Sequence, residues 1–250
     1  MDWMFLFYVV FGFLAQMIDG CLGMAYGVLS NSLLLSLGLP PAISSACTHT
    51  AEFFTTLASG VSHWKLGNVD KKLFLRLLIP GVIGGALGAY ILTQLPGNRI
   101  KPFIAIYLLV MGVIIMFKAF KKANPRELKR SIVPLGFAGG ICDAIGGGGW
   151  GPVVTSTLVA NGQEPKKAIG SVNSSEFFVT VAESVTFFIT MGALITQHWL
   201  AILGLLLGAL PTAPVAAYVC KKMRPKPLMI MVGLLIIATS FRTIYLSWLR

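Results

Sequence analysis

The sequence predicts an all-α integral membrane protein built from two repeats of opposite topology. Three observations support this fold class: an apolar composition, an internal repeat, and the placement of the basic residues. Of the 250 residues, 56% are hydrophobic and only 12% are charged, whereas soluble domains carry about 25% charged residues. The apolar residues stand in long blocks, such as 77–95 and 102–117, which are about long enough to cross a bilayer.

The internal repeat has an offset of 124 residues. The segment 12–19 recurs as 136–143, and both copies end in an aspartate, Asp19 and Asp143. Chance does not readily place acids in apolar sequence at one offset, so we infer a duplication. The chain then divides into a first transmembrane repeat (1–120), a basic linker (121–131) and a second transmembrane repeat (132–250). The offset also pairs Gly23 with Gly147, Gly27 with Gly151, Pro41 with Pro165, Glu52 with Glu176, and Gly84 with Gly208.

Each repeat contains five apolar segments, which we expect to be helical. The first two segments of each repeat have about 14 residues or fewer, so they reach only about 20 Å. They flank a glycine-rich break, which predicts a short helix-break-helix hairpin surrounded by protein or a cavity. The expected segments are 5–18, 24–37, 41–62, 73–95 and 102–120 in the first repeat, and 132–145, 151–160, 167–191, 199–219 and 228–246 in the second.

The basic residues indicate how the repeats are oriented. If each repeat crosses the membrane an odd number of times, sixteen of the 20 Lys and Arg residues share one side with the linker. Only Arg99, Lys101, Arg242 and Arg250 then lie on the other side, whereas an even number of crossings divides them twelve to eight. Lys and Arg concentrate in cytoplasmic loops. We therefore expect a cytoplasmic linker, external termini and inverted repeats, which are typical of secondary transporters, in a multi-pass protein of the cell (inner) membrane.

Five acids lie in apolar surroundings: Asp19, Glu52, Asp143, Glu176 and Glu183. A carboxylate in the hydrocarbon zone costs several kcal/mol unless it is paired, protonated or facing water. The four repeat-matched acids are therefore candidates for proton coupling. Glu52 and Glu176 either bind protons or accept bonds that position the hairpins. Asp19 and Asp143 directly precede the second short segment of each repeat, so a helix N-cap is the alternative role for them.

The glycine breaks are the candidate substrate-binding elements. Glycines let the backbone turn tightly and present free N–H groups at a helix N-terminus, which suits a small anion. Ser45 and His49, with Asn173 and Ser174 in the second repeat, supply further hydrogen-bond donors. The alternatives are that the glycines only permit close helix packing and that His49 is a hydrogen-bonded packing residue. The break residues are Gly20 and Gly23 in the first repeat and Gly146, Gly147, Gly148 and Gly149 in the second.

The sequence shows no motif for catalysis, metal binding or nucleotide binding. It has no Ser–His–Asp order, HExxH, CxxC or P-loop, so we expect no enzyme, no catalytic or metal-ligating residue and no cofactor. The net charge of +11 comes from residues between apolar blocks, which favours membrane topology over nucleic-acid binding. The expected partners are the lipid bilayer, a small inorganic or organosulfur anion and protons, and a homo-oligomer is left open.

These motifs together resemble the TauE/SafE sulfite exporter family, also called the toluene-sulfonate uptake permease family. The resemblance rests on the paired glycine-rich stretches, most clearly 136–151, on the turns at Pro41 and Pro165, and on the stretch 67–70 (GNVD). It covers nearly the whole chain. It implies a gradient-driven transporter of sulfite or a related organosulfur anion, coupled to protons. The alternatives are a cation or metal carrier that uses the intramembrane acids, and a membrane-embedded enzyme or assembly factor.

Overall fold

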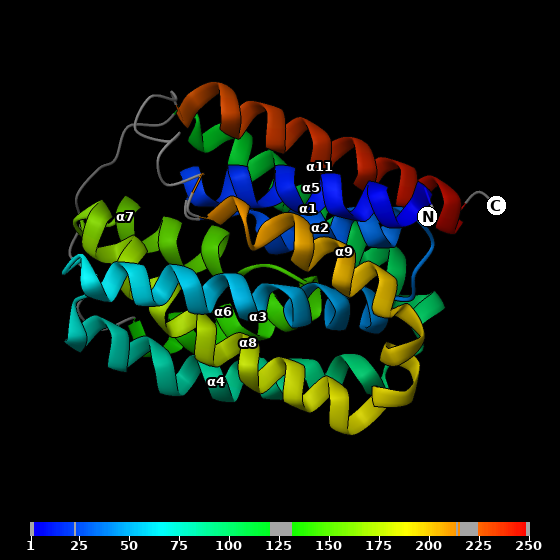
Figure 1. Ribbon diagram of the computed structural model, residues 1–250, viewed down its shortest axis with the longest axis horizontal. Helices are drawn as coiled ribbons and strands as arrows, with labels where there is room; N and C mark the ends of the chain where they lie inside the picture. The colour runs from blue at the N-terminus through cyan, green and yellow to red at the C-terminus, as the bar shows by residue number, and fades with distance from the viewer. Residues whose placement is uncertain (1–2, 23, 121–131, 214, 216–224, 249–250) are drawn as a thin grey trace.

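The computed structural model describes residues 3–22, 24–120, 132–213, 215 and 225–248, and every regular element in these ranges is a helix (Figure 1). The first half contains α1 (Trp3–Leu22), α2 (Tyr26–Ser36), α3 (Pro41–Lys65), α4 (Lys71–Gln94) and α5 (Gly97–Lys118). The second half contains α6 (Ile132–Gly146), the π-helix η1 (Trp150–Thr155), α7 (Ser156–Ala160), α8 (Pro165–Ile195), the 3-10 helix η2 (Thr196–His198), α9 (Trp199–Ala209) and α11 (Pro225–Trp248).

Within the described residues, four helical stretches are long and apolar enough to cross a membrane: Lys71–Gln94, Gly97–Lys118, Lys166–Ala209 and Met229–Trp248. Their outer surfaces are apolar, since Ile79 and Phe103 are 63% and 66% exposed. Polar residues gather inside instead, and His49 on α3 is fully buried. This distribution is the one expected for a protein whose outer solvent is lipid.

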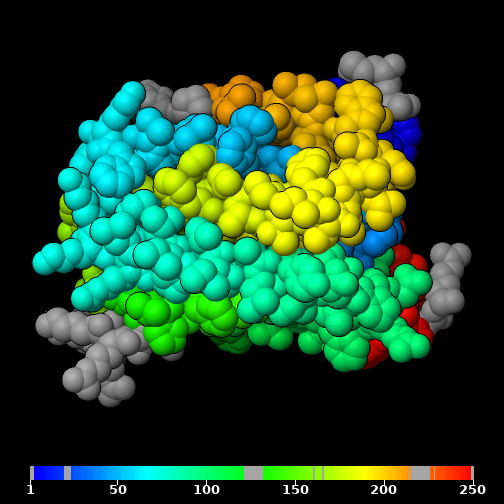
Figure 2. Space-filling model, turned by 90° about the horizontal axis from the view of Figure 1, so that it is seen from below, coloured from blue at the N-terminus to red at the C-terminus, as the bar shows by residue number. Residues whose placement is uncertain are grey.

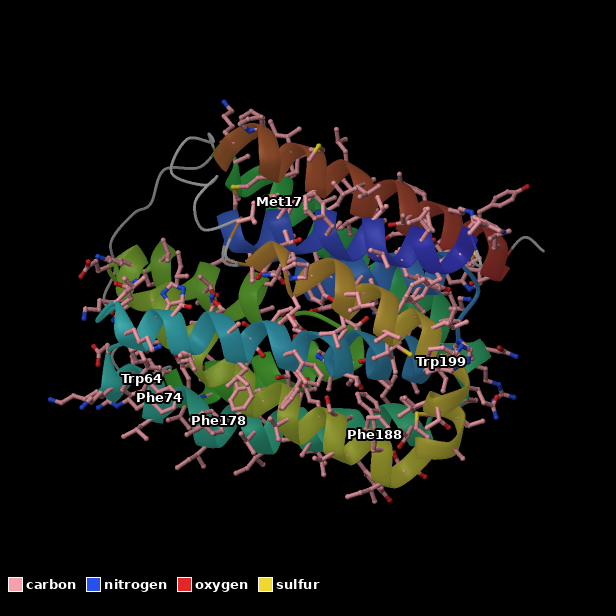
Figure 3. The ribbon with its side chains drawn as sticks, in the orientation of Figure 1. Met17, Trp64, Phe74, Phe178, Phe188 and Trp199 are labelled. Atoms are coloured by element: carbon pink, nitrogen blue, oxygen red, sulfur yellow. The ribbon has the colours of Figure 1, made fainter. Side chains whose placement is uncertain are left out.

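Aromatic residues at one edge of the helical bundle join three helices, and of these residues Trp64, Phe178 and Phe188 are exposed whereas Phe74 is buried. In Figure 3, Trp64, Phe74 and Phe178 lie along its lower edge, together with Phe188. The rings of Trp64 and Phe74 are 5.6 Å apart, and those of Phe74 and Phe178 are 6.0 Å apart. These contacts join α3, α4 and α8, and Figure 2 shows α4 and α8 side by side on this face.

Local sequence explains where the central helices begin. Pro41 and Pro165 stand in the first turns of α3 and α8, where a missing N–H costs nothing. Asp70 caps α4, because its carboxylate accepts hydrogen bonds from the backbone N–H groups of Lys72 (2.9 Å) and Leu73 (3.2 Å). The residues singled out at Pro41, Pro165 and in the stretch 67–70 thus start or connect helices.

Corresponding helices of the two halves pack in a reciprocal pattern. Helix α1 packs on α9 and α6 packs on α4, while α3 packs on α8 and α5 on α11. Glycines allow the same close approach in both halves. A Cβ on Gly84 would overlap the backbone of Phe137, and a Cβ on Gly208 would overlap that of Phe13. These four residues are two pairs at the 124-residue offset.

Helices that correspond by the repeat run in opposite directions. In Figure 1, α3 and α5 run from right to left, whereas α8 and α11 run from left to right. The end of α3, the start of α4, the end of α5 and the starts of α8 and α11 therefore lie at one end of the bundle. That end carries the basic residues Lys65, Lys71, Lys72, Lys118, Lys166, Lys167 and Lys226.

Two predicted hairpin details are wrong. Helix α1 has 20 residues rather than about 14, so Gly20 lies within its last turn instead of in a break. One glycine near a helix end costs only about 1 kcal/mol, and the apolar sequence around it continues to Leu22. In the second half the predicted helix 151–160 is divided into η1 and α7. The hydroxyls of Ser156 and Thr157 donate to the carbonyl groups of Pro152 and Val153, and such side-chain bonds to the carbonyl four residues earlier destabilise and bend an α-helix.

Candidate functional site

The second glycine break lies against the start of α2. Helix α6 ends at Gly146, and Gly147 (φ 65°) and Gly148 (φ 147°) then adopt backbone conformations that favour glycine. A Cβ on Gly27 would lie 2.7 Å from the Gly148 Cα atom. The break of the second half thus touches the helix that follows the break of the first half. Gly23 lies outside the described residues, so its predicted role keeps the status of a prediction.

The two repeat-matched aspartates bind backbone amides of the helix that follows. One carboxylate oxygen of Asp143 accepts hydrogen bonds from the N–H groups of Gly149 (2.6 Å) and Trp150 (2.9 Å). Asp19 accepts one from the N–H of Tyr26, at 3.3 Å. Both aspartates lie inside the preceding helices, however, and the N-cap residues are Ala25 and Gly149. The expected amide contact is present, but the expected N-cap position is wrong.

These contacts occupy backbone N–H groups of the second glycine break that were predicted to bind an anion. The Gly148 N–H donates to the backbone carbonyl of Asp143 (3.0 Å), and the Gly149 N–H donates to its carboxylate. A substrate at this break must therefore compete with Asp143 or bind through other groups. A helix N-terminus binds anions only through N–H groups that lack an internal partner.

Ser45 and His49 reach from α3 to the last turn of α6. The Ser45 hydroxyl donates to the carbonyl of Ala144 (2.6 Å), and His49 Nε2 lies 3.2 Å from the carbonyl oxygen of Asp143. Because a carbonyl only accepts, a hydrogen bond at this contact requires the proton on His49 Nε2. Ser45 and His49 therefore satisfy carbonyl groups at the C-terminal end of a helix, which have no partner within that helix.

Asn173 and Ser174 on α8 do not contact the glycine breaks in this arrangement. The Asn173 amide donates to the hydroxyl of Ser59 on α3 (3.0 Å). The Ser174 hydroxyl donates to the carbonyl of Gly170 in its own helix (2.7 Å). Both residues are buried between α3 and α8, where a Cβ on Gly60 would lie 3.4 Å from the Ser174 Cα atom. Asn173 and Ser174 thus hydrogen-bond to α3 and to their own helix, and not to the glycine breaks.

A small cavity lies between the two halves of the chain. Its volume is about 10 Å³, which is close to the space that one water occupies. Glu52 and Glu176 both line it, as do Asp143 and glycines of both halves. Eight of its lining residues are four pairs at the 124-residue offset: Ala25 with Gly149, Gly27 with Gly151, Val28 with Pro152, and Glu52 with Glu176.

A third glutamate, Glu183, lies beside His49 in this region. The His49 Nδ1 atom lies 3.1 Å from a carboxylate oxygen of Glu183 on α8 and 3.3 Å from one of Glu52. Glu183 is fully buried. Glu183 is an acid in apolar sequence that has no acidic counterpart at the 124-residue offset, so the predicted site, built on the four repeat-matched acids, did not include it. Its position in apolar sequence, rather than the repeat, was the signal that could have included it.

Comparisons with known proteins identify the family of this chain. A family model described as "Sulfite exporter TauE/SafE" matches residues 8–243. The chain belongs to the TauE/SafE family. It is similar to the "Probable membrane transporter protein YtnM" of Bacillus subtilis (strain 168), with 45% identity over 247 residues, or 95% of this chain and 82% of the relative.

Two plant relatives match over shorter ranges. "Sulfite exporter TauE/SafE family protein 3" of Arabidopsis thaliana is 28% identical over 108 residues, or 43% of this chain and 23% of its own length. "Sulfite exporter TauE/SafE family protein 6" of the same plant is 37% identical over 62 residues. No solved structure matches the chain. The family and the Bacillus relative make the chain a membrane transporter of the TauE/SafE family rather than an enzyme.

Proposed function

We propose that this TauE/SafE transporter is a secondary transporter that moves a small anion, sulfite or a related organosulfur anion, together with protons. Membership of a family named for sulfite export supports the substrate class. The observation that most directly supports proton coupling is the group of acids around the central cavity, with Glu52 and Glu176 in its wall. We place the protein in the cell (inner) membrane, with the 121–131 linker in the cytoplasm.

An alternating-access mechanism between two inverted repeats is part of this proposal. Its support is the reciprocal packing of corresponding helices and the opposite directions of α3 and α8, and of α5 and α11 (Figure 1). Inverted repeats allow the two halves to exchange shapes, so that one central site opens first to one side and then to the other. The central cavity has the position that this mechanism requires, because matched residues of both halves line it.

Electrostatics explains why an anion must enter this site together with protons. Two like charges 4 Å apart repel by about 4 kcal/mol at an effective dielectric constant of about 20. Glu52 and Glu176 both line the cavity, so ionised glutamates there would exclude an anion. Protonation removes that repulsion and leaves hydroxyl donors that can bind the anion.

Flux into proteoliposomes tests the proposal. Purified protein should move sulfite down its gradient, and an imposed pH gradient should accelerate the flux. Glu52→Gln and Glu176→Gln should each weaken the effect of the pH gradient, since glutamine keeps the shape of the side chain but binds no proton. Glu164→Gln is the matched control, because Glu164 is exposed at the start of α8. Unchanged pH dependence in both cavity variants would contradict proton coupling at these residues.

A cation carrier is the second candidate, and one observation favours it. His49, Asp143 and Glu183 each offer a ligand atom, and these atoms lie within 4.8 Å of one another. A histidine with two carboxylates is a ligand set that suits several divalent transition metals. The same vesicles distinguish the two functions, since a carrier of this kind would move a divalent cation and leave sulfite outside.

A further inference from the structure

Each half of the chain carries one basic residue that binds the hairpin of the other half. Lys118, the last residue of α5, donates from Nζ to the carbonyl of Pro152 in η1 (3.0 Å). Arg242 on α11 donates from Nη1 to the carbonyl of Ser36, the last residue of α2. Lys118 and Arg242 are repeat partners at the 124-residue offset, and α2 corresponds to η1 and α7 together. The two contacts are therefore reciprocal.

The two contacts lie at opposite ends of the bundle. In Figure 1, α5 ends on the left, whereas α11 ends on the right, and Arg242 lies near that end. The Lys118 contact is the closer one to the centre, because Pro152 lines the central cavity. Ser36 lies eight residues after Val28, which also lines the cavity, so it is about 12 Å further along α2.

Both carbonyl groups lack the backbone donor that a regular α-helix would supply. The residue four positions after Ser36 is Pro40, which has no N–H group. The residue four positions after Pro152 is Ser156, whose N–H donates to other carbonyl groups of η1 instead. The Ser156 hydroxyl and the Lys118 ammonium group donate to Pro152 in its place. These irregular positions thus leave carbonyl groups that hold a basic side chain at each end.

The charges of the two basic residues are not balanced by carboxylates in the described part of the chain. The ion pairs found there are those of His49 with Glu52 and Glu183. A carbonyl oxygen accepts a hydrogen bond but leaves the formal charge on the cation. An ammonium group has three N–H donors and a guanidinium group has five. Lys118 and Arg242 can therefore each bind an anion while they keep their carbonyl contact.

The central cavity needs a positive charge beside it if an anion is to enter. Its wall consists of acidic, small and apolar residues, and no described lysine or arginine is among them. Lys118 is the basic residue that bonds to this wall, through Pro152. A cation at the mouth of a cleft raises the local concentration of anions and the rate at which they enter.

We propose that Lys118 and Arg242 are two binding sites for the substrate anion, one on each side of the central cavity. A small oxyanion that enters from the cytoplasm binds Lys118 first, and one that enters from outside binds Arg242 first. Lys118 is half-buried whereas Arg242 is exposed, so water and salt weaken the outer site more. The inference rests on the proposed anion transport and adds two residues that the charge distribution had assigned only to membrane topology.

Glutamine substitutions test these sites, because glutamine removes the charge but can still donate to the carbonyl group. Everted and right-side-out membrane vesicles present the cytoplasmic and the external face to added sulfite. Lys118→Gln should raise the KM for sulfite about tenfold at the cytoplasmic face, the size expected for the loss of one charge-assisted hydrogen bond. Arg242→Gln should raise it about threefold, at the opposite face only, since its site is more strongly screened. Lys118→Arg keeps the charge and should keep the wild-type KM.

The matched controls remove an exposed charge at each end of the bundle. Lys65→Gln at the end of α3 is the control for Lys118, and Arg99→Gln at the start of α5 is the control for Arg242. Both should keep the wild-type KM at both faces. Wild-type KM values in the Lys118→Gln and Arg242→Gln variants would overturn the two sites and leave anion transport standing. Equal rises at both faces, or a loss in Lys118→Arg as large as that in Lys118→Gln, would also overturn them.

A binding measurement separates this inference from the proposed function. An anion that binds the folded protein raises the temperature of unfolding by mass action. Sulfite, with thiosulfate as a second probe, should stabilise the wild-type protein in detergent. The half-maximal concentration should be about tenfold higher in Lys118→Gln than in Lys65→Gln. If this difference is found but vesicles show no sulfite flux, the transport proposal fails and the anion site stands. If neither anion stabilises the wild-type protein, the anion sites are overturned.

Discussion

The two hairpins of this transporter follow one plan with different local solutions. In the first, α1 continues to Leu22, and the non-glycine residue Ala25 has a φ of 109° before α2. In the second, α6 ends at Gly146, and Gly147 and Gly148 supply the positive φ values. The first hairpin then continues as an 11-residue α-helix, whereas the second continues as a π-helix that contains Pro152.

The aspartates of the two hairpins also differ in the number and length of their hydrogen bonds to the next helix. Asp143 binds two amides at 2.6 and 2.9 Å, while Asp19 binds one at 3.3 Å. Short hydrogen bonds to a carboxylate are stronger than long ones. The second hairpin is therefore the more tightly fixed of the two. The two copies of this duplicated element thus keep the same place in the fold while their aspartates bind the next helix to different extents.

The largest expected effect of a single substitution is at Gly148. An alanine there would have a φ of 147°, and its Cβ would overlap the backbone of Gly27 and Val28. Strain and overpacking together should lower the free energy of unfolding by about 3 kcal/mol or more. Thermal unfolding in detergent measures this loss. If the second hairpin is not held tightly against α2, Gly148→Ala will lose no more than a substitution at an uncrowded turn.

Gly38→Ala provides that uncrowded reference. Gly38 has a φ of 104°, and a Cβ built on it meets no atom within 4 Å. Its substitution should cost about 1–2 kcal/mol, from the backbone conformation alone. The difference between the two variants therefore measures the contact between the second break and α2, rather than the general cost of alanine at positive φ.

Substitution of the aspartates should have an intermediate effect. Asp143→Ala leaves two buried amides without their acceptor and should cost about 2 kcal/mol or more, since hydrogen bonds to charged groups contribute about 1.5–3 kcal/mol. Asp19→Ala loses one long hydrogen bond and should cost about 1 kcal/mol or less. Thermal unfolding of both variants, with Asp143→Asn as the control that keeps an acceptor oxygen, checks the order. Equal losses at the two positions would remove the distinction between the hairpins.

The sequence predicted the membrane class and most helix positions, because long apolar blocks and prolines at helix starts act locally. Helix α3 begins at Pro41, the first residue of the expected segment 41–62, and α8 begins at Pro165, two residues before the expected segment 167–191. The repeat offset also predicted that Glu52 and Glu176 correspond, and both line the central cavity. The boundary of α1 was missed, since a single glycine does not end a helix when the apolar sequence around it continues.

The composition of the site was harder to predict than the fold, because it depends on contacts distant in sequence. Glu183 meets His49 across the α3–α8 interface, and no local pattern joins them. The repeat counterpart of Glu183 is Ser59 rather than an acid, so a prediction built on matched acids does not include it. Asn173 and Ser174 were grouped with the glycine breaks by sequence proximity, whereas helix α8 directs them toward α3 and toward its own backbone.

The smallest expected effect concerns Ala25, whose repeat counterpart is Gly149. Alanine is strained at a φ of 109°, and glycine adopts that conformation without a steric penalty. Ala25→Gly therefore relieves about 1–2 kcal/mol of strain. It also loses a buried methyl group and gains chain entropy in the unfolded state, which together cost about the same. We expect the free energy of unfolding to change by less than about 1 kcal/mol.

The matched reference for Ala25→Gly is Ala105→Gly in α5, where a buried alanine has a helical backbone. Glycine there should cost about 1 kcal/mol for helix propensity in addition to the lost methyl group. Thermal unfolding of the two variants side by side measures the difference. If Ala25→Gly destabilises the protein as much as Ala105→Gly does, the first hairpin stores no backbone strain at Ala25, and the two hairpins differ only in how tightly their aspartates are bound.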